Sequence, residues 1–103
     1  MSIHLQATLE IEAAGFERFT TIMGETVTIL EGVGWKLDAA YMHCTGRLNT
    51  VIDHWELEDM NHFDRGMQAL MGHPRFPAIH QVLGETVRNE TLVFLQKFDY
   101  PRR

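Results

Sequence analysis

The chain has 103 residues, with nine Lys and Arg against fourteen Asp and Glu, which gives a net charge of −5. This length fits one domain over residues 1–103, and 45% apolar residues are enough for one hydrophobic core. The negative charge argues against a nucleic-acid partner. The single cysteine excludes an internal disulfide, and the absence of a long apolar run or a basic leader argues against a membrane span or a signal peptide. We therefore expect an acidic cytoplasmic domain.

Hydrophobic periodicity predicts an alternation of strands and helices. Apolar residues occupy every second position from Ile3 to Ile11, which is typical of a strand with one buried face. From Phe16 the spacing changes to three and four, which predicts an amphipathic helix. The first half of the chain is expected to form a strand over 3–11, a helix from Phe16 to the glycines at 32 and 34, and strands over 35–43 and 48–57. A second helix follows, capped by Asp59 or Asn61 and broken at 72–74. A third helix begins at Pro74 or Pro77, and the last strand covers 91–98.

This order predicts a ferredoxin-like βαββαβ fold of the α+β class, with an antiparallel four-stranded sheet. Right-handed crossovers place the helices on one face of that sheet. The other face is then bare, and the first strand presents His4, Gln6 and Thr8 to it. A second copy of the chain can cover such a face, so we expect a homodimer that forms through the sheet.

The segment from Leu48 to Leu57, LNTVIDHWEL, resembles the third strand of NIPSNAP-like proteins, with Asn49 before a β-branched pair and Trp55 before an acidic residue. The helix through 64–67, the breaker before Pro74 and the Gly34-Trp35 step fit the same template. The resemblance covers nearly the whole chain. It implies a dimeric α/β barrel, in which the sheets of two ferredoxin-like subunits face each other, and a family without a settled biochemical activity.

The same superfamily contains antibiotic-biosynthesis-type monooxygenases, haem-degrading enzymes and polyketide cyclases, which resemble this chain in architecture. Their sites usually lie in a cleft between the sheet and the helices. NIPSNAP-like strands often carry His-Leu before the tryptophan, whereas this chain has Asp53-His54. The histidine is thereby shifted to the opposite face of the strand.

Six histidines are more than a chain of this length usually contains, and His can exchange a proton near pH 7. His54 and His80 are the candidate catalytic bases. Asp53 and His54 are adjacent on one strand and point to opposite faces, so they cannot form a pair with each other. Each needs a polar partner when buried, which Lys36, Tyr41 or Arg47 can supply. The competing interpretation is a satisfied core pair that fixes the register of the strand.

Four residues are candidates for substrate binding: Tyr41, Asn49, Asp53 and Trp55. Tyr41 and Trp55 can stack on an aromatic molecule or fill the core, and Asn49 can donate to a carbonyl or oxyanion. No motif indicates a metal site or a cofactor. The sequence favours a binding protein for a small apolar or aromatic molecule. The alternatives are a cofactor-independent monooxygenase or polyketide-cyclase-type enzyme, and a structural dimerisation module.

Overall fold

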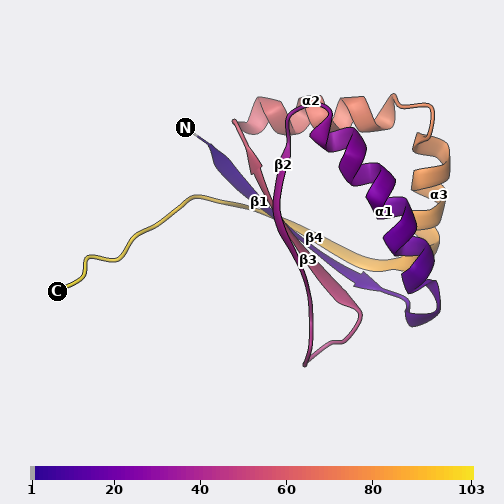
Figure 1. Cartoon of the computed structure of the whole chain (residues 1–103), viewed down its shortest axis with the longest axis horizontal. Coiled ribbons are helices and arrows are strands. Elements are labelled where there is room, and N and C mark those ends of the chain that lie inside the picture. The colour runs from indigo at the N-terminus through magenta and orange to yellow at the C-terminus, as the bar shows by residue number, and fades with distance from the viewer. Residues whose placement is uncertain (1) are drawn as a thin grey trace.

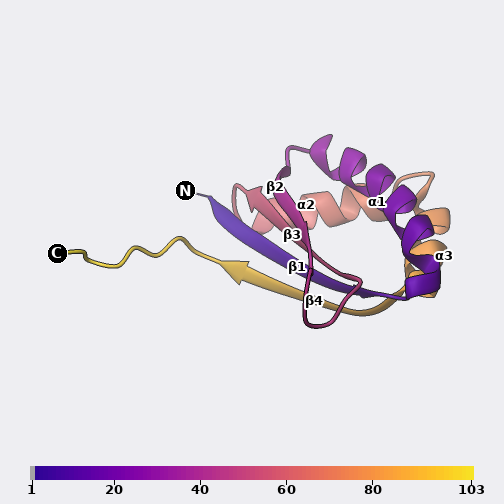
Figure 2. The same cartoon turned by 60° about the horizontal axis from the view of Figure 1, so that its bottom comes forward.

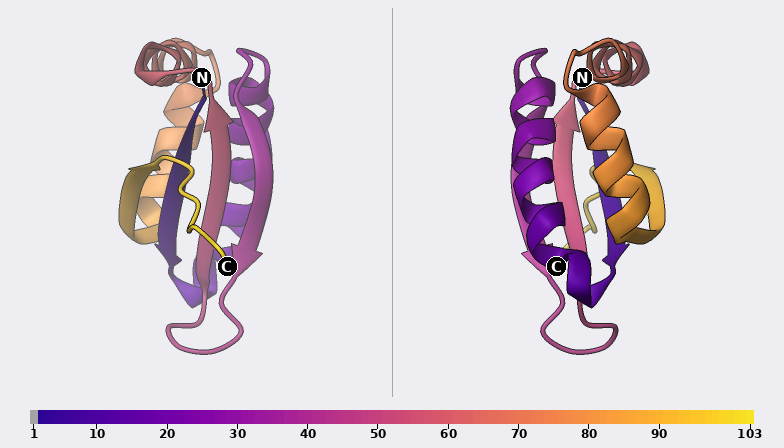
Figure 3. Two further views of the ribbon diagram at one scale, coloured as in Figure 1. Left: turned by 90° about the vertical axis from the view of Figure 1, so that its left-hand side faces the viewer. Right: turned by 90° about the vertical axis from the view of Figure 1, so that its right-hand side faces the viewer.

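Four strands form one antiparallel sheet within residues 2–103, the part of the chain that this computed structural model describes. The strands are β1 (Ile3–Ile11), β2 (Lys36–Met42), β3 (Thr50–Leu57) and β4 (Val87–Leu95). Their order across the sheet is β2-β3-β1-β4, so β1 and β3 are central (Figure 3). This is the strand order of the ferredoxin-like fold, and the predicted fold class is confirmed.

The helices all lie on one face of the sheet (Figures 1 and 2). A short 3-10 turn, η1 (Ala13–Gly15), leads from β1 into α1 (Phe16–Glu31), and α2 (Met60–Met71) and α3 (Phe76–Thr86) form the second crossover. Of the two predicted caps for α2, Asp59 is the one used, because its Oδ1 accepts a hydrogen bond from the backbone N–H of His62 at 2.8 Å. None of the helices in residues 2–103 has the length and apolar composition needed to cross a membrane.

The core fills the space between the helices and the sheet. Alternate residues of the two central strands point into it, because side chains on a strand alternate between its faces. Trp55 on β3 packs edge-on against Trp35, with ring centroids 5.4 Å apart, and Trp35 stacks on Phe63 of α2. The buried apolar residues are Leu5, Ala7, Leu9, Ile11, Phe19, Ile22, Leu30, Trp35, Trp55, Leu57, Leu70 and Ile79.

The opposite face of the sheet, here called the open face, carries no helix (left view of Figure 3). The register pairs His4 with Glu56 and Gln6 with His54, so all four side chains lie on it. Val93 and Leu95 of β4 lie on the same face and are each about 40% exposed. The open face is therefore a mixed polar and apolar surface, as the alternation in the first strand predicts.

Two strand starts and the regularity of a third strand differ from the sequence prediction. The last strand begins at Val87 rather than Thr91, because α3 passes into β4 without a loop. The third strand begins at Thr50, which leaves Leu48 exposed in the preceding loop. A bulge in β2 between Leu37 and Ala39 breaks its alternation. Because of this extra residue, Ala39 and Tyr41 lie on the open face and not on the side of Leu37.

Candidate functional site

A cavity of about 550 Å³ lies between the sheet and the helices, and we call it the main cavity. Its walls come from β1, β3 and β4 on one side and from all three α-helices on the other. Most of the lining is aliphatic or aromatic, including Trp55, Phe63 and Phe76. A second hollow of about 390 Å³, the side cavity, lies between α1 and β2. Both volumes fall in the range of small-molecule sites.

Asp53 lines both cavities, and so does Met23 of α1. Asp53 lies in the middle of β3, and its register neighbours are Ala7 on β1 and Ala40 on β2. These two small side chains leave space around the carboxyl group. Met23, whose thioether side chain is flexible, is the other residue that lines both cavities. Asp53 is thus the polar group at the junction of two apolar cavities.

The carboxyl group of Asp53 stands apart from the polar groups of the described residues. Its residue is 5% exposed, yet no side chain or backbone group of residues 2–103 forms a hydrogen bond or an ion pair with it. The three predicted partners are engaged elsewhere: Lys36 lies near Asp38 and Glu56, and Arg47 pairs with Glu10. Tyr41 lies on the open face, where its ring contacts His54 edge-on.

Burial raises the pKa of Asp53 from its ordinary 3.8 to about 6. The charge of neighbouring His54 opposes this shift, and that of Glu90 adds to it. Desolvation disfavours the charged form of any carboxyl, and here no donor compensates for it. Asp53 can therefore release or accept a proton close to neutral pH.

Glu90 is a second carboxyl in the lining of the main cavity. It lies on β4 opposite Leu9 of β1, and so on the helix-facing side of the sheet. Its outer side is exposed, but desolvation by the surrounding protein raises its pKa as well. The sequence pattern does not single out Glu90, because the predicted strand begins at Thr91, one residue after it. The side of the sheet on which Glu90 lies can be read from the alternation of β4 only when the strand is known to begin at Val87.

The structure divides the six predicted site residues among three places. Asp53, Trp55 and His80 line the main cavity, where the ring of His80 lies 5.4 Å from that of Phe76. Tyr41 and His54 lie on the open face, although Tyr41 also borders the side cavity. Asn49 is in the loop before β3, outside both cavities. One site that contains all six residues is therefore not formed.

Asn49 has a backbone role in its loop. Its φ of 62° lies in the left-handed region, which Asn tolerates better than most residues. Its carbonyl oxygen accepts a hydrogen bond from the backbone N–H of Ile11 at 2.9 Å. These features anchor the turn between β2 and β3 to the end of β1.

His54 is satisfied by its neighbours on the open face. Its Nε2–H donates to Oε1 of Gln6 at 3.1 Å, and its ring centroid lies 5.5 Å from that of Tyr41. His54 and Tyr41, together with His4 and Lys97, line a shallow hollow of about 400 Å³. His54 and Trp55 point to opposite faces, so His54 cannot act on a molecule that stacks on Trp55 in the main cavity.

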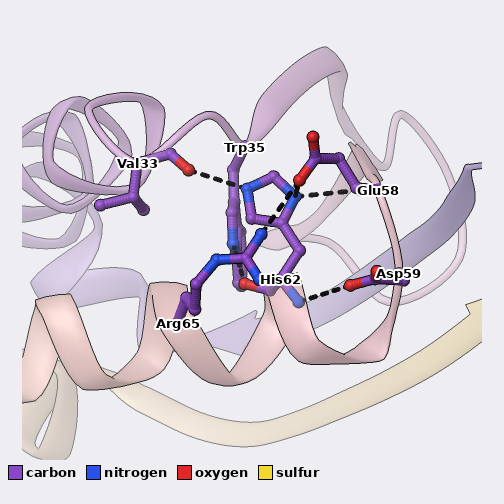
Figure 4. A network of polar contacts seen from close by, with 6 residues as sticks. All are labelled: Val33, Trp35, Glu58, Asp59, His62 and Arg65. Atoms are coloured by element: carbon purple, nitrogen blue, oxygen red, sulfur yellow. Dashed lines mark hydrogen bonds and ion pairs between the residues drawn. The ribbon is translucent and has the colours of Figure 1, made fainter.

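His62 is buried and structural (Figure 4). Its Nδ1 accepts from the backbone N–H of Glu58 at 3.0 Å, so its Nε2 carries the proton and donates to the carbonyl of Val33 at 2.8 Å. Its own carbonyl accepts from Nε1 of Trp35 at 2.9 Å. These bonds join the start of α2 to the connection between α1 and β2.

No protein-family model matches this sequence, and a comparison with curated proteins finds no relative. Solved structures do resemble it. An uncharacterized NIPSNAP domain protein from Burkholderia xenovorans superposes with a TM-score of 0.77 at 20% identity over the whole of both chains. A NIPSNAP family protein from Agrobacterium tumefaciens has a TM-score of 0.83 at 17% identity, covering 97% of this chain and 96% of its own. The chain has the NIPSNAP fold.

The same fold extends to a protein from Caulobacter crescentus that has been assigned by name to the antibiotic biosynthesis monooxygenases. It has a TM-score of 0.74 at 15% identity and covers 95% of this chain and 91% of its own. The NIPSNAP-like resemblance of the sequence is thus confirmed at the level of fold. A shared fold does not carry an activity with it, because function depends on the residues of the site.

Proposed function

We propose that this NIPSNAP-like protein binds a small apolar molecule in the main cavity, and that Asp53 is the polar contact for it. The observation that carries this proposal is a largely buried carboxyl group that has no hydrogen-bonding or ion-pairing partner among residues 2–103 and whose oxygen atoms remain accessible from an otherwise apolar cavity. Placing a carboxylate in a largely apolar cavity without a protein partner is unfavourable. A bound molecule that offers a hydrogen-bond donor relieves this penalty, and the apolar walls bind the rest of it.

The test is binding of an uncharged solvatochromic dye such as Nile red, followed by fluorescence. Ala7→Leu narrows the main cavity beside Asp53, whereas Ala39→Leu adds the same side chain on the open face. Circular dichroism establishes that both variants are folded, and Ala40→Leu, which narrows the side cavity, is a further variant. We expect Ala7→Leu to weaken dye binding at least fivefold and Ala39→Leu to leave it unchanged. Equal binding by these two folded variants would contradict a site in the main cavity.

A catalytic role is the second candidate, and the pKa of Asp53 favours it. A carboxyl group with a pKa of about 6 is suited to proton transfer near neutral pH. In this version Asp53 removes a proton from the bound molecule, and Trp55 forms part of the wall against which that molecule packs. Exchange of substrate protons with deuterated water, followed by NMR, tests it once a ligand is known. Exchange that persists in Asp53→Asn would exclude Asp53 as the base.

We also propose that a second copy of the chain covers the open face. The support is the exposure of Tyr41, Val93 and Leu95 on this face. Light scattering after size exclusion measures the mass in solution. We expect a dimer that Leu95→Glu dissociates. Met60→Glu is the matched control, because Met60 is also an exposed apolar residue but lies on α2. A monomeric wild-type protein would contradict this proposal and leave the cavity argument intact.

A further inference from the structure

The charges that line the main cavity are unbalanced. Asp53 and Glu90 both lack a hydrogen-bonding or ion-pairing partner within residues 2–103. The one arginine in the lining, Arg88, lies 3.2 Å from the carboxylate of Glu12 outside the cavity. His80 is the remaining titratable group of the lining, and its ring lies against Phe76. The cavity therefore presents two free carboxyl groups and no free arginine or lysine among the residues that the structure describes.

The two carboxyl groups approach the same hollow from two strands. Asp53 pairs with Ala7 on β1, and Glu90 pairs with Leu9 two residues further along the same strand. With strands about 4.8 Å apart and a rise of about 3.3 Å per residue, their Cα atoms are separated by about 12 Å. Side chains that extend toward each other across β1 shorten this gap. A positive group beside Asp53 is therefore also attracted by Glu90, at a longer range.

The aromatic lining suits the same kind of ligand. Trp55 lies two residues after Asp53 and on the same face of β3, so its ring borders the space next to the carboxyl group. A cation near a tryptophan ring gains a favourable interaction with the ring electrons. An anionic ligand would instead be repelled by two carboxylates, of which that of Asp53 is largely buried.

We propose that the main cavity selects an organic cation, namely a protonated primary or secondary amine on an apolar or aromatic body. This inference rests on the proposed binding function and adds the chemical class of the ligand. The ammonium group forms charge-assisted hydrogen bonds with Asp53, and the apolar body lies against the aromatic and aliphatic walls. Such hydrogen bonds are about twice as strong as those between neutral groups.

The pH dependence of binding follows from the groups around Asp53. These are His54 next to it on β3, Glu90 and Arg88 on β4, His80 on α3 and Tyr41 on β2. The parts of α1 and α2 that line the two cavities contribute no titratable side chain. Amine binding requires ionised Asp53, so affinity rises as the pH increases through about 6 and levels off above pH 7.

The experiment compares three ligands that share one naphthalene body: 2-(1-naphthyl)ethylamine, 2-(1-naphthyl)ethanol and 1-naphthylacetic acid. Isothermal titration calorimetry at pH 7.5 and low salt gives their affinities. We expect the amine to bind at least tenfold more tightly than the alcohol, and the acid to bind more weakly than the alcohol. Asp53→Asn should lower amine affinity at least tenfold and change alcohol affinity less than threefold.

Two further variants complete the design. Glu90→Gln should weaken amine binding about threefold, because Glu90 lies farther from the bound ammonium group than Asp53 does. This variant replaces Asp53→Asn as the test of the carboxyl groups if Asp53→Asn fails to fold. Glu31→Gln removes one negative charge at the end of α1, outside the lining of both cavities, and should leave all three affinities unchanged.

The outcomes separate the two levels of the proposal. If none of the three ligands binds the wild-type protein although Nile red does, this inference is refuted and the proposed binding function stands; if Nile red does not bind either, both are contradicted. If the alcohol or the acid binds as tightly as the amine, the cavity is a binding site but its selectivity for cations is refuted. An amine preference that survives in both Asp53→Asn and Glu90→Gln would refute the assignment of the two carboxyl groups.

Discussion

The buried carboxyl group of Asp53 makes a direct prediction about stability, because replacing it with the amide of Asn removes the ionisation without changing the shape of the side chain. The pKa of Asp53 is 3.8 in an ordinary exposed setting and about 6 in the folded protein. This difference corresponds to about 3 kcal/mol of free energy of unfolding. The folded state binds the proton more tightly than the unfolded state does.

The sign of the effect follows from this. Below pH 3.8 the group is protonated in both states and its titration does not affect stability. Between pH 3.8 and about 6 the stability falls as the pH rises, and above that range the penalty is at most about 3 kcal/mol, because solvent reaches the carboxyl oxygens and screens part of it. Asp53→Asn should therefore be about as stable as wild type near pH 3.5, and more stable by up to about 3 kcal/mol at pH 7. Burying the neutral acid in the wild type costs about as much as burying the amide in Asp53→Asn, so this cost cancels when the two proteins are compared.

Urea unfolding followed by tryptophan fluorescence measures this difference, since Trp35 and Trp55 are buried in the core. Both proteins are unfolded at one protein concentration in steps from pH 3.5 to pH 8. Other carboxyl groups also titrate, but subtracting one profile from the other isolates Asp53. Glu31→Gln should run parallel to wild type. Parallel profiles for Asp53→Asn and wild type, or a variant less stable at pH 7, would refute the reasoning.

Three further changes test how the helices are held against the sheet. Gly66→Ala places a methyl group against the indole ring of Trp35 and should lower the free energy of unfolding by about 1–3 kcal/mol, as measured in urea. Gly24→Ala is the matched control in α1, where an added Cβ has no atom within 4 Å; it should raise stability by about 0.5–1 kcal/mol, and a loss would contradict the free space seen there. His62→Phe leaves the carbonyl of Val33 without its donor and should destabilise the fold by about 2 kcal/mol in the same assay, whereas a change below about 0.5 kcal/mol would show that this network contributes little.

The sequence predicts the fold well where periodicity is regular. The strict alternation from Ile3 to Ile11 gives the first strand with its correct bounds and faces. Asp59 is recognisable as a cap because its carboxylate can reach a backbone N–H three residues ahead. Adjacency alone also places Asp53 and His54 on opposite faces, although the sequence does not indicate which of them faces the helices.

The rest depends on contacts between distant segments. The bulge beside Asp38 moves Tyr41 to the open face, and nothing local in the sequence signals that extra residue. The missing partner of Asp53 is likewise a tertiary property. Arg47 was a reasonable candidate, but it pairs with Glu10 on β1. Ala7 and Ala40 leave space around Asp53 because the register of the sheet places them beside it, and this register cannot be read from the sequence.

The most direct test of the account is a carbon-13 NMR titration of the Asp53 carboxyl group, with and without 2-(1-naphthyl)ethylamine. We expect a midpoint near pH 6 in the free protein, since the group is largely buried and has no hydrogen-bonding or ion-pairing partner within residues 2–103. With the amine bound, the midpoint should fall well below that value, because a nearby positive charge favours the ionised form. If the midpoint in the protein without ligand lies near the ordinary 3.8 and the amine does not change it, Asp53 is neither desolvated nor the contact for the amine.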